Sequence, residues 1–227
     1  MRRVVEPELM LAPEQASAYA DADFADSDNR FVARFVELFG KSLHGEIIDL
    51  GCGPGNITLR MSTAYPECLI TGIEGAPNML EIARNRAEQV SGSEGRMQFL
   101  QVTLPDRLLA GRGAVAVVSN SLLHHLHDPQ VLWRSLMDIG APGAAVLVAD
   151  LRRPESSRRA REIVDNYARQ ASGILRDDYY NSLLAAFEVE EVVGQLENAG
   201  LTSLTARTVD DRYLEVSGRL PSRAMSI

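Results

Sequence analysis

The stretch EIIDLGCGPGNITLRM, residues 46–61, places three glycines at alternate positions directly after a short apolar run that ends in an acid. Beyond the glycines, Ile57, Met61, Ala64 and Tyr65 fall on one helical face until Pro66 stops the pattern. Glycine has no Cβ, so a ligand can approach the backbone closely there, and the following helix start offers free N–H groups. The stretch therefore predicts a strand, a glycine turn and a helix that together bind a ligand.

The rest of the chain alternates between apolar runs and amphipathic helical patterns. The apolar runs predict further strands at residues 68–75, 97–103, 114–120 and 144–151. The helical patterns cover residues 26–39, where the DSDN sequence can cap the start, then 77–87 and 128–140. This βαβ alternation predicts an α/β fold with a doubly wound, mostly parallel sheet.

The pattern changes after residue 151. A helical region runs from residue 155 to 200, with breaks near Gly173 and Glu188. Two β-rich runs, residues 201–209 and 212–220, then flank Asp210-Asp211, which predicts a two-residue turn and an antiparallel C-terminal hairpin. We expect a seven-stranded sheet in all. Residues 1–40 are assigned to an N-terminal helical cap, and residues 41–227 to a Rossmann-like domain with a helical insertion at about 155–187.

The composition excludes some classes of partner. A net charge of −8 and a pI near 5.1 argue against nucleic acid as a partner, because phosphates would be repelled by the overall field. No run approaches the roughly 20 apolar residues of a membrane span, and acids interrupt the basic N-terminus where a signal peptide needs an apolar core. We therefore expect a cytoplasmic protein with a small-molecule partner. The sequence leaves monomer and homodimer open.

Two acids decide which nucleotide fits the glycine turn. Glu74 lies 19 residues after Gly55, close to the spacing of about 20 at which a carboxylate meets a ribose hydroxyl. Asp49 lies two residues before Gly51, where a dinucleotide would place its pyrophosphate. A carboxylate there repels a diphosphate but attracts a ligand that carries an ammonium and a sulfonium group. The charge pattern thus favours S-adenosylmethionine over NAD, unless Asp49 merely accepts hydrogen bonds from loop amides.

These motifs resemble those of the class I S-adenosylmethionine-dependent methyltransferases of the small-molecule type. IIDLGCGPGN matches the first motif of that family, GIEGAPNML its second-strand acid region and VVSNSLLHHLHDP its fourth-strand motif. The resemblance implies a Rossmann-like methyltransferase fold with S-adenosyl-L-methionine as the cofactor. It also implies cofactor contacts for a set of residues: Tyr19, Asp49, Gly51, Gly53, Gly55, Asn56, Glu74, Gly75, Met79, Thr103, Leu104, Asn120 and Ser121.

Three of these residues have particular roles in the resemblance. Glu74 would bind the ribose hydroxyls and Met79 would pack near the adenine. Thr103 departs from the pattern, because the family commonly has an acid at that position to accept from the adenine amino group. A hydroxyl accepts such a hydrogen bond less strongly. The adenine contact therefore differs from that of the family.

Catalysis of methyl transfer depends mainly on alignment, and a base is needed only for an acceptor that must lose a proton. His124 and His125 follow the fourth strand and are the candidates for that base, and Tyr180 is a further catalytic candidate from the helical insertion. We expect no metal site among His124, His125, His127 and Asp128, because adjacent residues on a helix point apart.

Methyl transfer to a small molecule is the leading function. The alternatives are an NAD-binding oxidoreductase and a methyltransferase-like protein that binds S-adenosylmethionine without transferring its methyl group. The sequence does not identify the acceptor, because the helical caps that would recognise it carry no motif.

Overall fold

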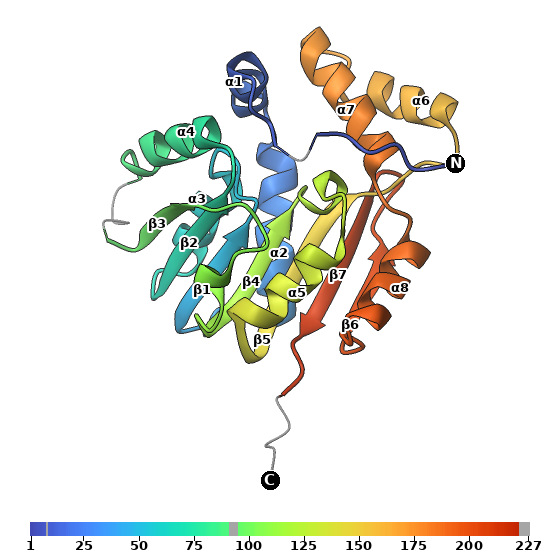
Figure 1. The fold of residues 1–227 in the computed structure, drawn as a ribbon. Coiled ribbons are helices and arrows are strands. Elements are labelled where there is room, and N and C mark those ends of the chain that lie inside the picture. The colour runs from blue at the N-terminus through green and yellow to red at the C-terminus, as the bar shows by residue number, and fades with distance from the viewer. Residues whose placement is uncertain (8, 91–94, 223–227) are drawn as a thin grey trace.

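The computed structural model describes residues 1–7, 9–90 and 95–222. Its described residues form a seven-stranded sheet in the order β3-β2-β1-β4-β5-β7-β6 (Figure 1). The strands are β1 (Gly45–Leu50), β2 (Cys68–Glu74), β3 (Met97–Gln101), β4 (Ala114–Asn120), β5 (Gly140–Leu151), β6 (Leu204–Thr208) and β7 (Tyr213–Arg219). Strands β1 to β5 are parallel, whereas β7 pairs antiparallel with both β5 and β6. The predicted α/β fold with an antiparallel C-terminal hairpin is confirmed.

Helices cover both faces of the sheet. The α-helices of the described residues are α1 (Pro13–Asp21), α2 (Ala25–Phe39), α3 (Asn56–Ala64), α4 (Pro77–Ala87), α5 (Gln130–Ile139), α6 (Ser157–Tyr167), α7 (Gly173–Ala185) and α8 (Val189–Asn198). On one face, α2 and α3 pack apolar residues such as Phe35 and Met61 against β1, β4 and β5. On the other face, α5 and α8 pack Trp133 and Leu196 against the same strands. The near-continuous apolar character of β4 and β5 follows, since both of their faces are buried.

Several boundaries differ from those predicted. Helix α2 begins at Ala25, so the DSDN sequence lies in its first turn rather than ahead of it. Strand β5 begins at Gly140, directly after α5, and is longer than expected. Four residues rather than two separate β6 from β7, and the Asp210 carboxylate accepts from the N–H groups of Arg212 and Tyr213 within that turn. Side-chain hydrogen bonds to the backbone explain this wider turn.

The carboxyl ends of the parallel strands are roofed by α1, α6, α7 and the N-terminal segment, defined here as residues 1–7 and 9–12 (Figure 1). Arg3 anchors this segment: its guanidinium donates to the backbone carbonyls of Ala185, His124 and Leu126. The N–H of Val4 also donates to the carbonyl of Leu184 at 3.0 Å. The expected cap of residues 1–40 thus divides: α1 lies over the strand ends, whereas α2 packs against the sheet.

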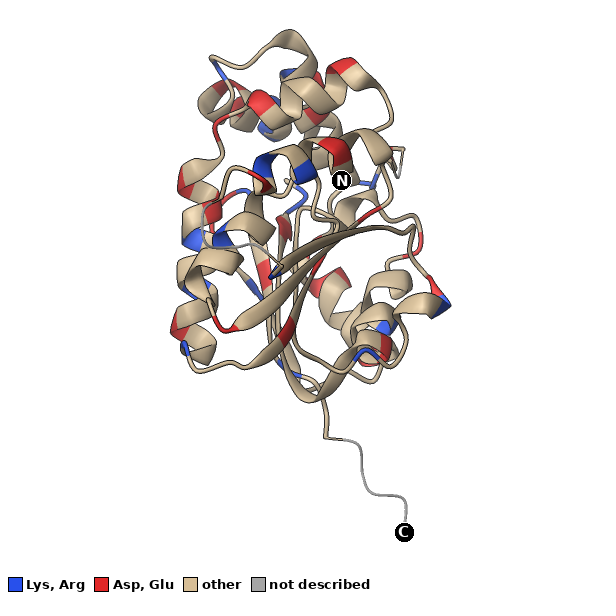
Figure 2. Ribbon diagram, turned by 90° about the vertical axis from the view of Figure 1, so that its left-hand side faces the viewer, with Lys and Arg blue, Asp and Glu red and all other residues tan. Residues whose placement is uncertain are grey.

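Charged residues of both signs are interspersed along the ribbon (Figure 2). Many form ion pairs, among them a buried Glu215 that is bound by both Arg34 and Arg207. Within the described ranges, no helix has the length and apolar character needed to cross a membrane.

Candidate active site

A single large cavity lies at the carboxyl ends of β1, β2, β4 and β5, and its volume is about 1070 Å³. The chain order of the sheet reverses between β1 and β4, which is where ligands bind in open parallel sheets. Residues from α1, α2, α7 and the β6–β7 hairpin complete its walls. The fold therefore places the glycine turn inside a deep cavity.

The three glycines of the turn differ in the atoms that surround them. Gly51 and Gly53 line the cavity, and both have a positive φ, at 69° and 52°. A Cβ on Gly51 would lie 2.9 Å from atoms of Leu122, whereas a Cβ on Gly53 would meet no described atom within 4 Å. Gly55 does not line the cavity; a Cβ there would lie 3.2 Å from Ala83 on α4. Gly53 is thus the open part of a cradle, and Gly55 serves helix packing.

Asp49 lies at the base of the cavity and is only 1% exposed. Its Oδ2 accepts a hydrogen bond from the Thr58 hydroxyl at 2.6 Å. Burial raises the pKa of this carboxyl to about 7, even though the Thr58 hydrogen bond favours the ionised form. Ionising a buried carboxyl is unfavourable unless a cation lies beside it, so Asp49 suits an ammonium or sulfonium ligand.

Glu74 ends β2 beside the glycine turn. Its Oε2 accepts from the N–H of Gly53 at 3.0 Å, and its Oε1 accepts from the N–H of Ala76 at 2.8 Å. The carboxylate is therefore fixed in orientation while it lines the cavity. The ribose-binding role of Glu74 stays a prediction.

The other residues expected to contact the cofactor also line the cavity: Tyr19, Asn56, Gly75, Met79, Thr103, Leu104, Asn120 and Ser121. Tyr19 comes from α1, and its ring lies 4.9 Å from that of Phe24. Ser121, directly after β4, has a φ of 59°. A non-glycine residue in this conformation is strained and is often held so at a functional site.

His124 is buried beneath the cavity wall on the short helix η2 (Leu123–His125). Its Nδ1 lies 2.6 Å from Oδ1 of Asp150, which is itself 1% exposed. Asp150 also accepts from the N–H groups of Leu123 and Leu151, so the carboxylate is rigidly held. Although burial lowers the pKa of His124, attraction to Asp150 raises it more, and the net shift is upward.

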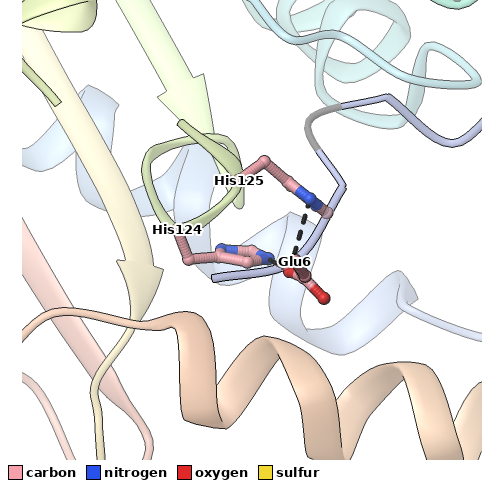
Figure 3. A group of neighbouring side chains, drawn as sticks. All are labelled: Glu6, His124 and His125. Carbon is pink, nitrogen blue, oxygen red and sulfur yellow. Dashed lines mark ion pairs between the residues drawn. The ribbon is translucent and has the colours of Figure 1, made fainter. Parts of the chain in front are cut away.

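His125 packs its ring on that of His124, with the ring centroids 4.2 Å apart. Burial, helped by repulsion from His124, lowers the pKa of His125 to about 3, which keeps the imidazole neutral. Glu6 of the N-terminal segment faces both rings (Figure 3): its Oε1 lies 3.5 Å from Nε2 of His124 and 3.3 Å from Nδ1 of His125. The expectation that adjacent histidines point apart is wrong here, because the two rings lie beside each other and both face Glu6.

Tyr180, the third catalytic candidate, does not line the cavity. Its ring packs against the cluster between α6 and α7, with the Arg161 guanidinium 4.9 Å from its centroid. The neighbouring Tyr179 lines the cavity instead. Successive residues of a helix project about 100° apart, so one position decides which tyrosine faces the cavity.

Arg212 and Tyr179 form a second polar group in the wall. The Arg212 guanidinium lies 3.7 Å from the Tyr167 ring centroid and 4.9 Å from that of Tyr213. Nε of Arg212 and the hydroxyl of Tyr179 are buried and make no hydrogen bond of regular geometry with the described residues, although the guanidinium and the phenol interact with each other. Such buried donors indicate a place for an acceptor group from a ligand.

Sequence reasoning missed Asp150, Glu6 and Arg212. Asp150 ends an apolar strand, as Asp49 does, and the same signal would have found it. Glu6 has no such signal, because its place depends on how the N-terminal segment docks against α7 and η2. Arg212 follows a turn whose length the sequence did not predict.

Comparison with known proteins agrees with this geometry. Residues 47–143 match the family model described as a methyltransferase domain. The chain is 32% identical over 165 residues to trans-aconitate 2-methyltransferase of Streptomyces coelicolor, covering 69% of this chain and 51% of that protein. It is 24% identical over 189 residues to a ubiquinone/menaquinone biosynthesis C-methyltransferase of Syntrophotalea carbinolica, covering 79% and 78%. The chain thus spans about half the length of the first of these relatives.

Solved structures show the same fold. A SAM-dependent methyltransferase from Aquifex aeolicus superposes with a TM-score of 0.65 at 14% identity, over 92% of this chain and 99% of that chain. The plantazolicin methyltransferase BpumL, solved with S-adenosylhomocysteine, gives a TM-score of 0.65 at 13% identity, over 92% and 90%. The cofactor is S-adenosylmethionine. From its motifs, its fold and these similarities, the chain belongs to the class I S-adenosylmethionine-dependent methyltransferases.

Proposed function

We propose that the protein transfers the methyl group of S-adenosylmethionine to a carboxylate oxygen of a small organic acid. Support comes from relatives named trans-aconitate 2-methyltransferase, which include the Streptomyces coelicolor protein and one from Methylobacterium nodulans at 34% identity over 55% of this chain. The observation that carries the proposal is the buried guanidinium of Arg212 beside Tyr179 in the wall of the cofactor cavity, whose Nε makes no hydrogen bond of regular geometry with the described residues. An acidic acceptor needs such a cationic contact.

The residues of the cradle fit the cofactor. Gly53 leaves open space beside the backbone, Glu74 presents a fixed carboxylate for the ribose hydroxyls, and Asp49 offers a buried negative charge to the ammonium group. Met79 and Thr103 line the adenine end in this proposal. When bound, S-adenosylmethionine supplies an activated methyl group on a sulfonium.

The cavity has room for an acceptor as well. Its volume of about 1070 Å³ lies at the upper end of the roughly 300–1,000 Å³ of pockets that hold one drug-sized ligand. Arg34 and Arg207 also line it, but both are bound to Glu215, and the fourth lining arginine, Arg30, is exposed to solvent. Arg212 has a buried donor that remains available, so it is the residue to which we assign the acceptor's negative charge.

The chemistry asks little of the protein beyond alignment. A carboxylate is already ionised at neutral pH, so it can displace the methyl group without a general base. Arg212 and Tyr179 would orient the acid, while α1 and the N-terminal segment exclude water from above the strand ends.

A second candidate is transfer to a hydroxyl or amine. The observation in its favour is the hydrogen bond between His124 and Asp150, because a carboxylate on Nδ1 leaves Nε2 as a proton acceptor. His124 would then be the catalytic base and Asp150 its positioning residue. His125, with its low pKa, would stay neutral beside it.

The test is an assay of S-adenosylhomocysteine release with trans-aconitate, other di- and tricarboxylic acids, and matched alcohols and amines. We expect turnover with an acid and a product that mild alkali hydrolyses, since methyl esters are cleaved and methyl ethers are not. An alkali-stable product would favour the second candidate. Tight cofactor binding with no turnover of any acceptor would favour a binding protein, and binding of NAD alone would reject both.

A further inference from the structure

We propose that Glu6, His124 and His125 form a binding site for a divalent transition-metal ion such as Zn²⁺. The three side chains come from the N-terminal segment and from η2, so Glu6 and His124 are 118 residues apart in the sequence and meet only in the fold (Figure 3). The inference does not rest on the proposed function, because a chain that binds no metal here can still transfer a methyl group.

The donor atoms have the spacing of a coordination sphere. One ligand atom from each residue lies within 4.8 Å of the others. Oε1 of Glu6 is 3.5 Å from Nε2 of His124 and 3.3 Å from Nδ1 of His125. Bond lengths of about 2.0–2.2 Å in a tetrahedral site place neighbouring donors roughly 3.3–3.6 Å apart. The two separations to Glu6 fall in that range.

Outer partners orient two of the three ligands. Asp150 binds Nδ1 of His124 at 2.6 Å, so the imidazole presents Nε2 to Glu6. The Ser182 hydroxyl donates to the Glu6 carboxylate at 3.1 Å. A carboxylate behind a ligating histidine is the usual arrangement in zinc sites, where it fixes the ring and strengthens the donor. In the metal-free protein Nδ1 of His125 also lies 3.4 Å from the Pro7 carbonyl oxygen, so its proton is shared between that oxygen and Glu6, and a metal ion would replace this proton.

The chemistry of the donors selects the class of metal. Two imidazoles and one carboxylate suit Zn²⁺, Fe²⁺ or Co²⁺ better than Mg²⁺ or Ca²⁺, which prefer oxygen. The carboxylates of Glu6 and Asp150 carry two negative charges, whereas the nearby guanidinium of Arg3 carries one positive charge, so the surroundings favour a cation. Both histidines line the cavity, so a molecule in the cavity can supply a fourth ligand. An ion on Nε2 would also stop His124 from accepting a proton, which would remove the second candidate function.

The test is titration of untagged, metal-stripped protein with Co²⁺, followed by its visible absorption, and competition with Zn²⁺. We expect one Co²⁺ per chain, with affinity at least tenfold lower in Glu6→Gln and in His125→Ala. His44→Ala is the matched control, because His44 is exposed and lies outside the cluster, and its affinity should equal that of the wild type. Fluorescence of Trp133, the single tryptophan, reports whether each variant is folded.

Three outcomes would overturn the site. These are no saturable one-to-one binding in the wild type, unchanged affinity in both variants, or a sulfur ligand in the X-ray absorption spectrum of the zinc-loaded wild type. The spectrum requires no variant, so a variant that failed to fold would leave the question decidable. Nitrogen and oxygen neighbours alone, together with the loss in either folded variant, would support it.

Discussion

The carboxylate of Glu74 accepts a hydrogen bond from the backbone N–H of Gly53 at 3.0 Å, which joins the end of β2 to the glycine turn after β1. The two residues are 21 positions apart, and the sheet brings them together because β1 and β2 are parallel neighbours. One oxygen of the Glu74 carboxylate therefore holds the glycine turn in place. The other oxygen accepts from the N–H of Ala76, which fixes the orientation of the carboxylate.

Replacing Glu74 with alanine should weaken S-adenosylmethionine binding by more than tenfold, or about 1.4 kcal/mol, because both the ribose contact and the support of Gly53 are lost. Calorimetric titration measures this. Glu81→Ala is the control, since Glu81 is an exposed acid on the adjacent helix α4 and should leave affinity unchanged. Equal affinities in the two variants would reject the ribose role.

Alanine at Gly51 and at Gly53 should have different consequences, although both residues have a positive φ. At Gly51 the methyl group meets Leu122 at 2.9 Å, so we expect unfolding free energy to fall by roughly 2–4 kcal/mol, from backbone strain plus overpacking. At Gly53 only the strain applies, roughly 1–2 kcal/mol. Denaturant unfolding followed by Trp133 fluorescence compares the two.

The variants Gly51→Ala and Gly53→Ala also distinguish an effect on stability from an effect on cofactor binding. A methyl group on Gly53 points into open space in the cradle, so Gly53→Ala should lose cofactor affinity at least tenfold while remaining the more stable variant. Full affinity in Gly53→Ala would mean that the cofactor does not approach this part of the backbone.

Cofactor affinity should depend on pH through Asp49, whose pKa in the free protein is about 7. Below pH 7 the carboxyl is mostly protonated, and a cationic ligand must expel that proton to bind. We therefore expect affinity to rise between about pH 6 and 8 and then level off. Calorimetry across that range measures the slope, and Asp49→Asn should flatten it. A slope that persists in Asp49→Asn would assign the effect to another group.

The stability of the free protein should change in the opposite direction. Because burial raises the Asp49 pKa from 3.8 to about 7, the folded chain keeps a proton that the unfolded chain releases. Between about pH 4 and 7 the free energy of unfolding therefore falls as the pH rises. Asp28, with a pKa raised to about 6 by burial, acts in the same direction. Urea midpoints at pH 5 and 7.5 test this, and saturating cofactor should reduce the difference.

Arg212→Ala should raise the KM for an acidic acceptor at least tenfold, with little effect on cofactor affinity, because the Arg212 guanidinium is assigned to the acceptor. Steady-state assays with the best acid from the panel measure it. Arg219→Ala is the control from the far end of β7, where Arg219 donates to the carbonyl of Gly143. An unchanged KM in Arg212→Ala would place the acceptor elsewhere in the cavity.

The sequence predicted the sheet well because its signals are local. Apolar runs such as residues 114–120, and helix ends such as Gly40, appear directly in the letters, and β4 and α2 follow them. The residues assigned to the cofactor also have a local signal, since Asp49 and Glu74 lie at the carboxyl ends of β1 and β2 and Gly53 follows β1. Each of these residues is placed by its own strand, and parallel pairing then aligns the strand ends.

The acceptor side was not predictable, because it depends on how separate segments dock. Glu6 reaches the histidines only because Arg3 fixes the N-terminal segment to the carbonyls of η2 and α7. Tyr179 faces the cavity in place of Tyr180 because of the orientation of α7 about its own axis. The apolar residues of α7 are not gathered on one side, so the sequence does not predict that orientation. The convergence of His124 and His125 on Glu6 depends on the same docking.

Strand β7 lies between β5 and β6, although it follows both of them in the sequence. Until β7 leaves the ribosome, the apolar run Ala144–Val148 of β5 is an uncovered sheet edge, which favours aggregation. Tyr213, Leu214 and Glu215 of β7 also complete the cavity wall. During synthesis the cavity is thus finished only once β7 pairs with β5, so a nascent chain that binds S-adenosylmethionine has already covered this edge.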